Sequence, residues 1–203
     1  MDVRHSRAVA GKTRWRRFAA FALPSTVLTG VILVAMANGA IAASFAVSGS
    51  SFKVSASSMD GTGFVQYGSA VQEKSGALHP VAVAGIPSAT ITNLCQSVTV
   101  PGTPFSVILH AGGGKTPASA TGLMFDLASL QADAQFTDIT IGQDASTLNA
   151  AGPNAHGAAG GFGQQASHIT LTNVKQTAWS ASAGTFNLND MDLQVSLTGA
   201  QCF

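Results

Sequence analysis

The residues of this chain that could do chemistry are its serines, its histidines and a few carboxylates. Hydrolysis by a serine needs a nucleophile, a histidine base and an oxyanion hole. Serine is abundant, but no G-x-S-x-G segment is present to place one on a nucleophile elbow. We predict that His79, before a proline, and His156, among glycines, are exposed turn residues, and that His110 and His168 flank strands. The pattern therefore favours no catalytic triad.

Nucleotide and metal motifs are also incomplete. Gly112–Thr116 is GGGKT, like the end of a phosphate-binding loop, but Leu109 stands where that motif needs its first glycine, so we predict a turn. Asp190 and Asp192 would share one face of a strand, where they could bind a cation weakly or simply be solvated. Asp60 precedes glycines but lacks the further ligands at alternate positions that a Ca²⁺ loop needs. We therefore expect solvated carboxylates and assign no catalytic residue, no metal and no cofactor.

Charge is sparse and unevenly distributed. Only 9% of the residues are charged, against about 25% in a typical soluble domain. Six of the ten basic residues lie within the first 17, whereas residues 18–203 hold four lysines and eight acids, a net charge of −4. This body lacks the basic patch that nucleic acids require. Its 46% hydrophobic content also excludes a charge-rich disordered chain.

The basic segment leads into an uncharged apolar run that ends at residue 43. This order is typical of a secretory signal, and Ala40, Ala42 and Ala43 would supply the cleavage site, after Ala42. Alternatively, residues 18–37 are long enough to span a bilayer and to stay as an anchor, with the bases on the cytoplasmic side. Residues 1–42 are thus predicted to be a signal peptide or transmembrane anchor, and residues 43–203 an extracytoplasmic domain.

The chain has two cysteines, Cys95 and Cys202. An even number of cysteines in an exported chain indicates a disulfide. A bridge between Cys95 and Cys202 would close the long loop between these two residues, which stabilises a fold by about 4–5 kcal/mol in the chain-entropy treatment. Two free thiols and a bridge between chains are the alternatives. Zinc is not indicated, because neither cysteine has a second ligand at the usual spacing.

The body is predicted to be a single all-β domain. Turn residues recur at short intervals, and period-two alternation dominates between them. We expect an antiparallel β-sandwich or a curved sheet, preceded by an N-terminal apolar helix. The expected strands are residues 44–48, 52–56, 64–67, 81–84, 90–100, 105–110, 136–141, 169–178, 186–191 and 193–197, with a turn at 60–63 and a strand or short helix at 123–130.

A short pattern occurs four times: an apolar residue, a small polar residue, Asn or Asp, and a second apolar residue. Its copies are residues 91–94, 136–139, 171–174 and 188–191, at irregular spacing, which excludes a solenoid of fixed period. If the copies are equivalent, their Asn and Asp side chains are expected to bond the backbone at bulges or turns. Coincidence in a chain rich in Thr and Asn is the alternative.

Residues 149–167 carry five glycines and no charge, so we predict a flexible loop. Such long loops in a compact domain are either functional or disordered. This one could serve as a lid over a ligand.

Several segments together resemble a known family of proteins. They are RRFA at 16–19, ASFAVSG at 43–49, SFKVSA at 51–56, DGTGF at 60–64, ATITNLCQS at 89–97, QTAW at 176–179 and the final CF. The combination resembles an actinobacterial, streptomycete-type family of exported or membrane-anchored proteins of unknown function. Its members are often labelled cholesterol esterase and are often encoded beside a small multipass membrane protein. The resemblance implies such a partner but supplies no catalytic residue.

These observations favour a non-catalytic cell-envelope protein that binds or scaffolds at the outer side of the membrane. One alternative is a β-domain that binds lipid or another apolar ligand. The other is hydrolysis of lipid or cholesterol esters, which the family label suggests and the missing elbow argues against.

Overall fold

The structure is a computed structural model that describes residues 48–203. The predicted all-β class is confirmed, and the strands belong to one antiparallel sheet. The elements are β1 (Phe52–Gln72), β2 (Leu78–Thr92), β3 (Leu94–Thr99), β4 (Ser106–Ala111), β5 (Ala118–Thr137), β6 (Thr140–Asp144), the 3₁₀ helix η1 (Ala145–Thr147), β7 (Phe162–Ser182), β8 (Thr185–Asn187) and β9 (Asp192–Ser196).

The predictions for the N-terminal region lie outside the described residues. They comprise the apolar helix, the signal or anchor, the cleavage site at Ala40, Ala42 and Ala43, and most of the strand expected at 44–48. Among residues 48–203 we find no helix with the length and apolar character needed to cross a bilayer.

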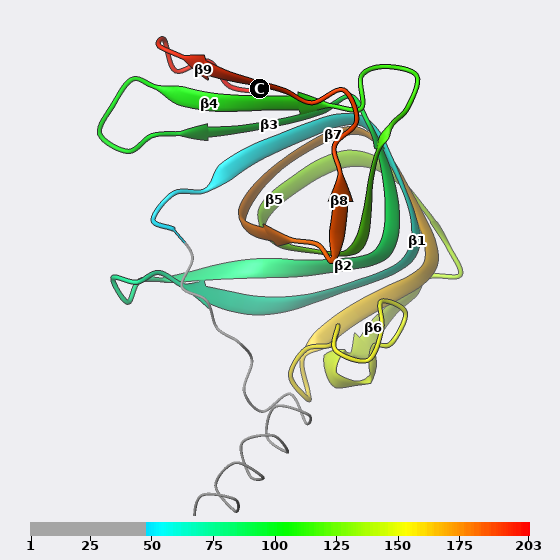
Figure 1. The fold of residues 1–203 in the computed structure, drawn as a ribbon. Helices are drawn as coiled ribbons and strands as arrows, with labels where there is room; N and C mark the ends of the chain where they lie inside the picture. Colours follow the sequence, from blue (N-terminus) through cyan, green and yellow to red (C-terminus); the bar gives the residue numbers. More distant parts are fainter. Residues whose placement is uncertain (1–47) are drawn as a thin grey trace, which may run out of the picture. The chain divides into compact units, whose positions relative to one another are not determined.

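Four long strands close the sheet on itself, and we call them the ring. β1 pairs with β2 along one edge and with β7 along the other, while β5 joins β2 to β7. Figure 1 shows these strands curving around a common interior. β6 extends the sheet beyond β7, and the short β8 pairs with β5. The predicted curved sheet is therefore the closer description, because there is no second sheet to form a sandwich within residues 48–203.

Three shorter strands leave the ring together, and we call them the arm. β3 follows β2 directly and pairs with the start of β1, β4 pairs with β3, and β9 pairs with β4. Figure 1 shows β3, β4 and β9 extending beside one another. β9 ends the strand order, so no strand of the described chain pairs with its outer edge.

The interior of the ring holds the main hydrophobic core. Alternation turns one face of each long strand inward, where it escapes water. Phe64 packs against Phe136 with ring centroids 5.3 Å apart. The largest fully buried apolar side chains of this core are Ile91, Leu123, Ile169 and Val174.

The turn predicted at residues 60–63 is wrong, because these residues continue β1. Gly61 is buried, and a Cβ atom there would lie 2.7 Å from Ile86 Cγ2 and 3.1 Å from Ile169 Cγ2. Glycine therefore serves close packing across the ring, and not a reversal of the chain.

Two kinks cross the ring, and at each of them the strands change which residues face inward. In β1 the buried residues are even-numbered up to Ala56, odd-numbered at Met59 and Gly61, and even-numbered again at Phe64. β2 changes in the same way on both sides of Ala89 and Ile91, and β7 on both sides of Ile169 and Leu171. The pairing register stays constant along β1, so the neighbouring strands kink at the same level.

The repeated four-residue pattern marks kinks of this kind. Its third residue is the one that adopts positive φ, and no other non-glycine residue in the described chain does so: Asn93 (53°), Asp138 (51°), Asn173 (55°) and Asp190 (52°). Asn and Asp tolerate this left-handed conformation better than most residues.

The side chains at three of these kinks bond other side chains, and not the backbone as the pattern predicted. Asn93 Nδ2 donates to Ser57 Oγ at 2.8 Å, and Asn173 Nδ2 donates to Asp133 Oδ2 at 2.7 Å. Ser167 Oγ donates to Asp138 Oδ2 at 2.8 Å and also lies 3.1 Å from Thr137 O. Each of these bonds joins neighbouring strands, so the pattern fastens the sheet where it bends.

The glycine-rich loop is shorter and better attached than predicted. β7 begins at Phe162, so residues 162–167 are strand. The amides of Asn149 and Ala150 donate to Gln165 Oε1 at 2.9 and 3.1 Å. At the other end, Gly160 N donates to Asp144 Oδ2 at 2.8 Å. Leu148 and Ala155 are buried with Val65 in a second, smaller core, on the outer face of the ring.

Candidate functional site

The four histidines of the described chain lie apart, and none is hydrogen-bonded to a serine there. His79 Nε2 is 2.7 Å from Glu73 Oε1, and its ring stacks on Trp179 with centroids 3.7 Å apart. It is half-buried in β2, so the exposed turn predicted for it is wrong. His168 Nε2 is 2.9 Å from Asp60 Oδ2 at a partly exposed position in β7.

The cluster around His79 does not have the order of a catalytic triad. The bond from His79 lowers the pKa of Glu73, and a bond from the Ser75 hydroxyl adds to this effect. Ser75 Oγ donates to Glu73 Oε2 at 3.0 Å, so the hydroxyl is bound to the acid and not to the imidazole. A nucleophile must donate to its base, so this arrangement fixes the β1–β2 hairpin and activates no serine.

Some of the remaining motif residues meet where the turn before β5 approaches β4 and β9. His110 pairs with Asp192 across β4 and β9, and Asp190 lies beside Gly114 at a hollow that His110 also lines. Asp190 lies in the kink before β9, and Asp192 lies within β9; both are exposed. Within residues 48–203, no three His, Cys, Asp or Glu side chains gather as metal ligands would. Gly112–Thr116 connects β4 to β5 as predicted, with Gly112 O accepting from Asn93 N at 2.9 Å.

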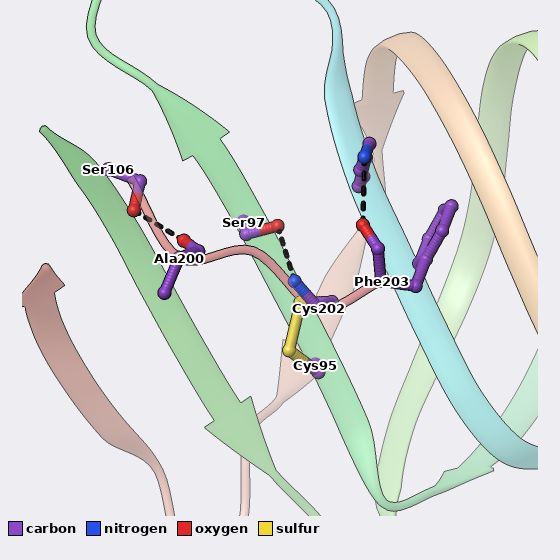
Figure 2. Close-up of a disulfide and its surroundings, with 7 residues drawn as sticks. Cys95, Ser97, Ser106, Ala200, Cys202 and Phe203 are labelled. Atoms are coloured by element: carbon purple, nitrogen blue, oxygen red, sulfur yellow. Dashed lines mark hydrogen bonds between the residues drawn. A yellow bond between two sulfur atoms is a disulfide. The ribbon is translucent and has the colours of Figure 1, made fainter. Parts of the chain in front are cut away.

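The C-terminal segment, residues 198–203, covers one face of the arm. It is held there by the predicted disulfide between Cys95 and Cys202 (Figure 2). Cys202 N donates to Ser97 Oγ at 3.1 Å, and Ser106 Oγ donates to Ala200 O. Ser97 and Ser106 are buried, and these bonds satisfy their hydroxyls.

The last residue ties the same segment to the ring. Lys53 Nζ, from the start of β1, donates to the main-chain oxygen of Phe203 at 2.8 Å and lies 4.9 Å from the centroid of its ring. Lys175 Nζ, from β7, lies 5.8 Å from the same centroid. The aromatic ring thus lies within reach of two cations.

The opposite face of the arm is apolar and has no cover in the described chain; we call it the open face. Cross-strand pairing places Leu193 beside Leu109 and Val195 beside Val107. The apolar side chains of β4, β9 and their ends on the open face are Phe105, Val107, Leu109, Leu193, Val195 and Leu197, and Val98 and Gln96 of β3 continue the same face. Leu193, Val195 and Leu197 are 56%, 62% and 69% exposed. Contiguous exposed apolar surface of this kind marks interaction sites.

A second apolar feature lies beneath the tip of the glycine-rich loop. It is a hollow of about 340 Å³, and its lining is mainly apolar. The ring contributes Ile86, Leu123 and Met124, and the loop contributes residues 151–155. Tyr67 lies beneath the loop near Gly157, and burial, followed by the charge of Asp126, raises its pKa.

Comparison with protein-family models identifies the family of this chain. The model of DUF6230, described as a family of unknown function, matches residues 48–203. The chain belongs to this family. Neither the curated proteins nor the solved structures provide a significant match. The DUF6230 match covers the ring, the arm and the covering segment, so the open face and the loop hollow both lie within the family's domain.

The open face was not predicted from the sequence, although a strand with alternating apolar residues was expected at 193–197. The signal was present in Leu193, Val195 and Leu197. Alternation alone does not tell whether another element covers the apolar side. That depends on β9 being the last strand of the sheet.

Proposed function

We propose that this DUF6230 domain is a non-catalytic binding or scaffolding module at the outer side of the cytoplasmic membrane. The observation that carries the proposal is the open face, an apolar sheet surface beside a free strand edge. In a domain with no partner at this surface, these apolar side chains would stay in water and would not contribute the free energy that burial provides. A binding partner removes them from water and completes the sheet.

Three further observations support an extracytoplasmic place for the domain. The basic N-terminus and the apolar run after it are typical of export or anchoring. The Cys95–Cys202 disulfide suits an oxidising compartment. The body carries few charges and no basic patch, which suits contact with envelope material more than with nucleic acid. A membrane protein is the partner class that the family resemblance implies.

Site-specific photo-cross-linking tests this proposal. A photo-reactive residue replaces Val195 in the full-length chain within the cells that make it. Leu78, which is 67% exposed at the far end of β2, receives the same residue as a control. We expect cross-links to an envelope component from position 195 and not from position 78. Equal labelling at both positions, or none, contradicts the proposal, as does ester turnover by the purified chain that one substitution abolishes.

A second candidate function, binding of a small apolar ligand, is favoured by the loop hollow. Its volume of about 340 Å³ is at the lower end of the range for ligand pockets. An apolar fluorophore, N-phenyl-1-naphthylamine, is the probe. We expect fluorescence enhancement by the full-length chain that Ala151→Phe removes by filling the hollow. Ala158→Phe, on an exposed part of the same loop, is the control; equal loss in both variants rejects the site.

A further inference from the structure

We propose that β9 of one chain pairs antiparallel with β9 of a second copy, so that two open faces join into one. This proposal rests on the proposed function, because it names the partner of the free edge beside the open face, where pairing brings the apolar rows of two copies side by side. It adds a symmetric interface in which the same residues of both copies meet.

The first reason is the free edge. Among residues 48–203, β9 is paired only with β4, through residues 192–196. The backbone groups on its other side are available to a further strand. An exposed edge of this kind is a template for strand addition unless a charge, a proline or a cover blocks it. β9 has no proline and no lysine, and the covering segment lies on its polar face and not along its edge.

The second reason is that the open face suits a protein strand better than a bilayer. Its side chains include no Trp, Tyr, Lys or Arg, which are the residues that hold proteins at a membrane interface. Lipid also cannot satisfy the N–H and C=O groups along the edge of β9. A second strand supplies backbone partners and apolar side chains together.

The third reason is that β9 is complementary to itself. Leu193, Val195 and Leu197 alternate with polar residues, so an antiparallel pair centred on Gln194 or Val195 places apolar residues opposite apolar residues. The charged residue of the strand, Asp192, then faces Ser196 or Thr198 of the other copy. The two carboxylates lie about four residues or more apart, roughly 13 Å, which exceeds a Debye length of about 10 Å. Like charges therefore do not oppose the pairing.

Measurement of association by native mass spectrometry or analytical ultracentrifugation tests the proposal. The full-length chain in mild detergent is compared with Val195→Lys, which places a charge in the apolar row. Val195 is 62% exposed, so the variant is expected to fold, which a thermal scan checks. We expect a dimer for the unaltered chain and at least tenfold weaker association for Val195→Lys.

The matched control is Ile141→Lys, on β6 at the other end of the sheet. Ile141 is also exposed, at 64%, and its variant is expected to dimerise normally. A second measurement uses Gln194→Cys with a short bis-maleimide, which should link two copies close to the two-fold axis. Gln135→Cys, on an exposed part of β5, should not link them.

Each other outcome overturns the proposal. A chain that stays monomeric at every concentration excludes self-pairing. Equal weakening by Ile141→Lys indicates a head-to-tail contact between β6 and β9, which is not the two-fold pair proposed. A monomer that still cross-links to another envelope component from position 195 overturns self-pairing but leaves the proposed function standing. Loss of that cross-linking as well overturns both.

Discussion

The ring and the arm are built from strands of the same alternating kind, but they use their apolar faces differently. In the ring, β1, β2, β5 and β7 close on one another, and their apolar faces meet in a filled core. In the arm, the polar face is covered by the C-terminal segment, and the apolar face carries side chains that are more than half exposed. Leu109 belongs to both regions, because it lies on the open face and packs against the ring core.

The difference shows how one pattern produces two outcomes. Alternation makes every strand two-faced, and closure of the sheet decides whether the apolar face becomes core or surface. Apolar side chains of the ring are buried when the domain folds, and this stabilises the fold. Those of the arm stay exposed after folding, so their burial can stabilise a complex with a partner. This contrast predicts that substitutions in the two regions will separate stability from binding.

The largest effect is expected from truncation of a ring side chain. Ile91 is 1% exposed, and Ile91→Ala should lower the free energy of unfolding by about 2–5 kcal/mol, because it removes buried methylenes and leaves a cavity. Leu193→Ala on the open face should change it by less than about 0.5 kcal/mol at protein concentrations too low for two β9 strands to pair. Urea unfolding of both variants makes the comparison. Similar losses in the two would mean that the open face is covered in solution.

Removal of the disulfide should come next and should act mainly on the arm. Cys95 and Cys202 are separated by 107 residues in the sequence. The double variant Cys95→Ser/Cys202→Ser should lose about 2–5 kcal/mol, because the unfolded chain is no longer constrained. Hydrogen exchange should show the loss of protection in β3, β4 and the covering segment before the ring. Uniform loss across both regions would contradict a separate role for this tie.

A smaller effect is expected at Asn93, where the ring passes into the arm. Its φ of 53° is costly for a β-branched residue, so Asn93→Val should destabilise the fold by about 1–2 kcal/mol. Asn93→Gly accepts the same conformation and loses only the bond to Ser57, so it should cost less. Unfolding by urea gives both values. If the glycine variant is the weaker one, the Ser57 bond and not the backbone sets the requirement.

These positions also show how much of the fold could be predicted. Strand content followed from alternation, and the cysteine pair followed from there being one possible bridge within the chain. Closure of the ring could not be predicted, because it depends on pairs such as Phe52 with Ala178, which are distant in sequence. Alternation also changes phase at Ser57 and Gly63, which hides the continuity of β1. The repeated pattern indicated bulges or turns at its four Asn and Asp residues, although not which strands these residues would join.

The candidate site was harder to predict than the strands. A histidine before a proline suggests a turn, but His79 is placed by stacking on Trp179, a contact between residues 100 positions apart. Glycines at 60–63 suggest a reversal, but the same residues permit close packing. The open face requires knowledge of which strand is last in the sheet. Local sequence patterns predict that a segment is a strand. Which of its two faces is exposed depends on how the strand pairs within the sheet.

The smallest effect is expected from a change of pH. It should alter the attachment of the glycine-rich loop to the ring but not that of the C-terminal segment to the arm. The covering segment of the arm is held by a covalent bond, whereas the loop over the ring is held partly by Asp144. Bonds from the amides of Ser146 and Gly160, and from the Ser146 hydroxyl, lower the pKa of Asp144 below its usual value of 3.8. A lowered pKa in the folded state means that this contribution is present above pH 4 and is lost as the pH falls through the folded value.

Protection factors of individual amides measure this effect. Those of Ser146 and Gly160 should fall as the solution is acidified below about pH 4, which is the range set by the usual pKa of a carboxyl group. Asp144→Asn should make them independent of pH over that range. The amide of Cys202, which donates to Ser97, should show no such change, because no carboxylate holds it. If protection falls equally at Cys202 and Gly160, acid opens the whole domain, and the loop has no separate attachment to lose.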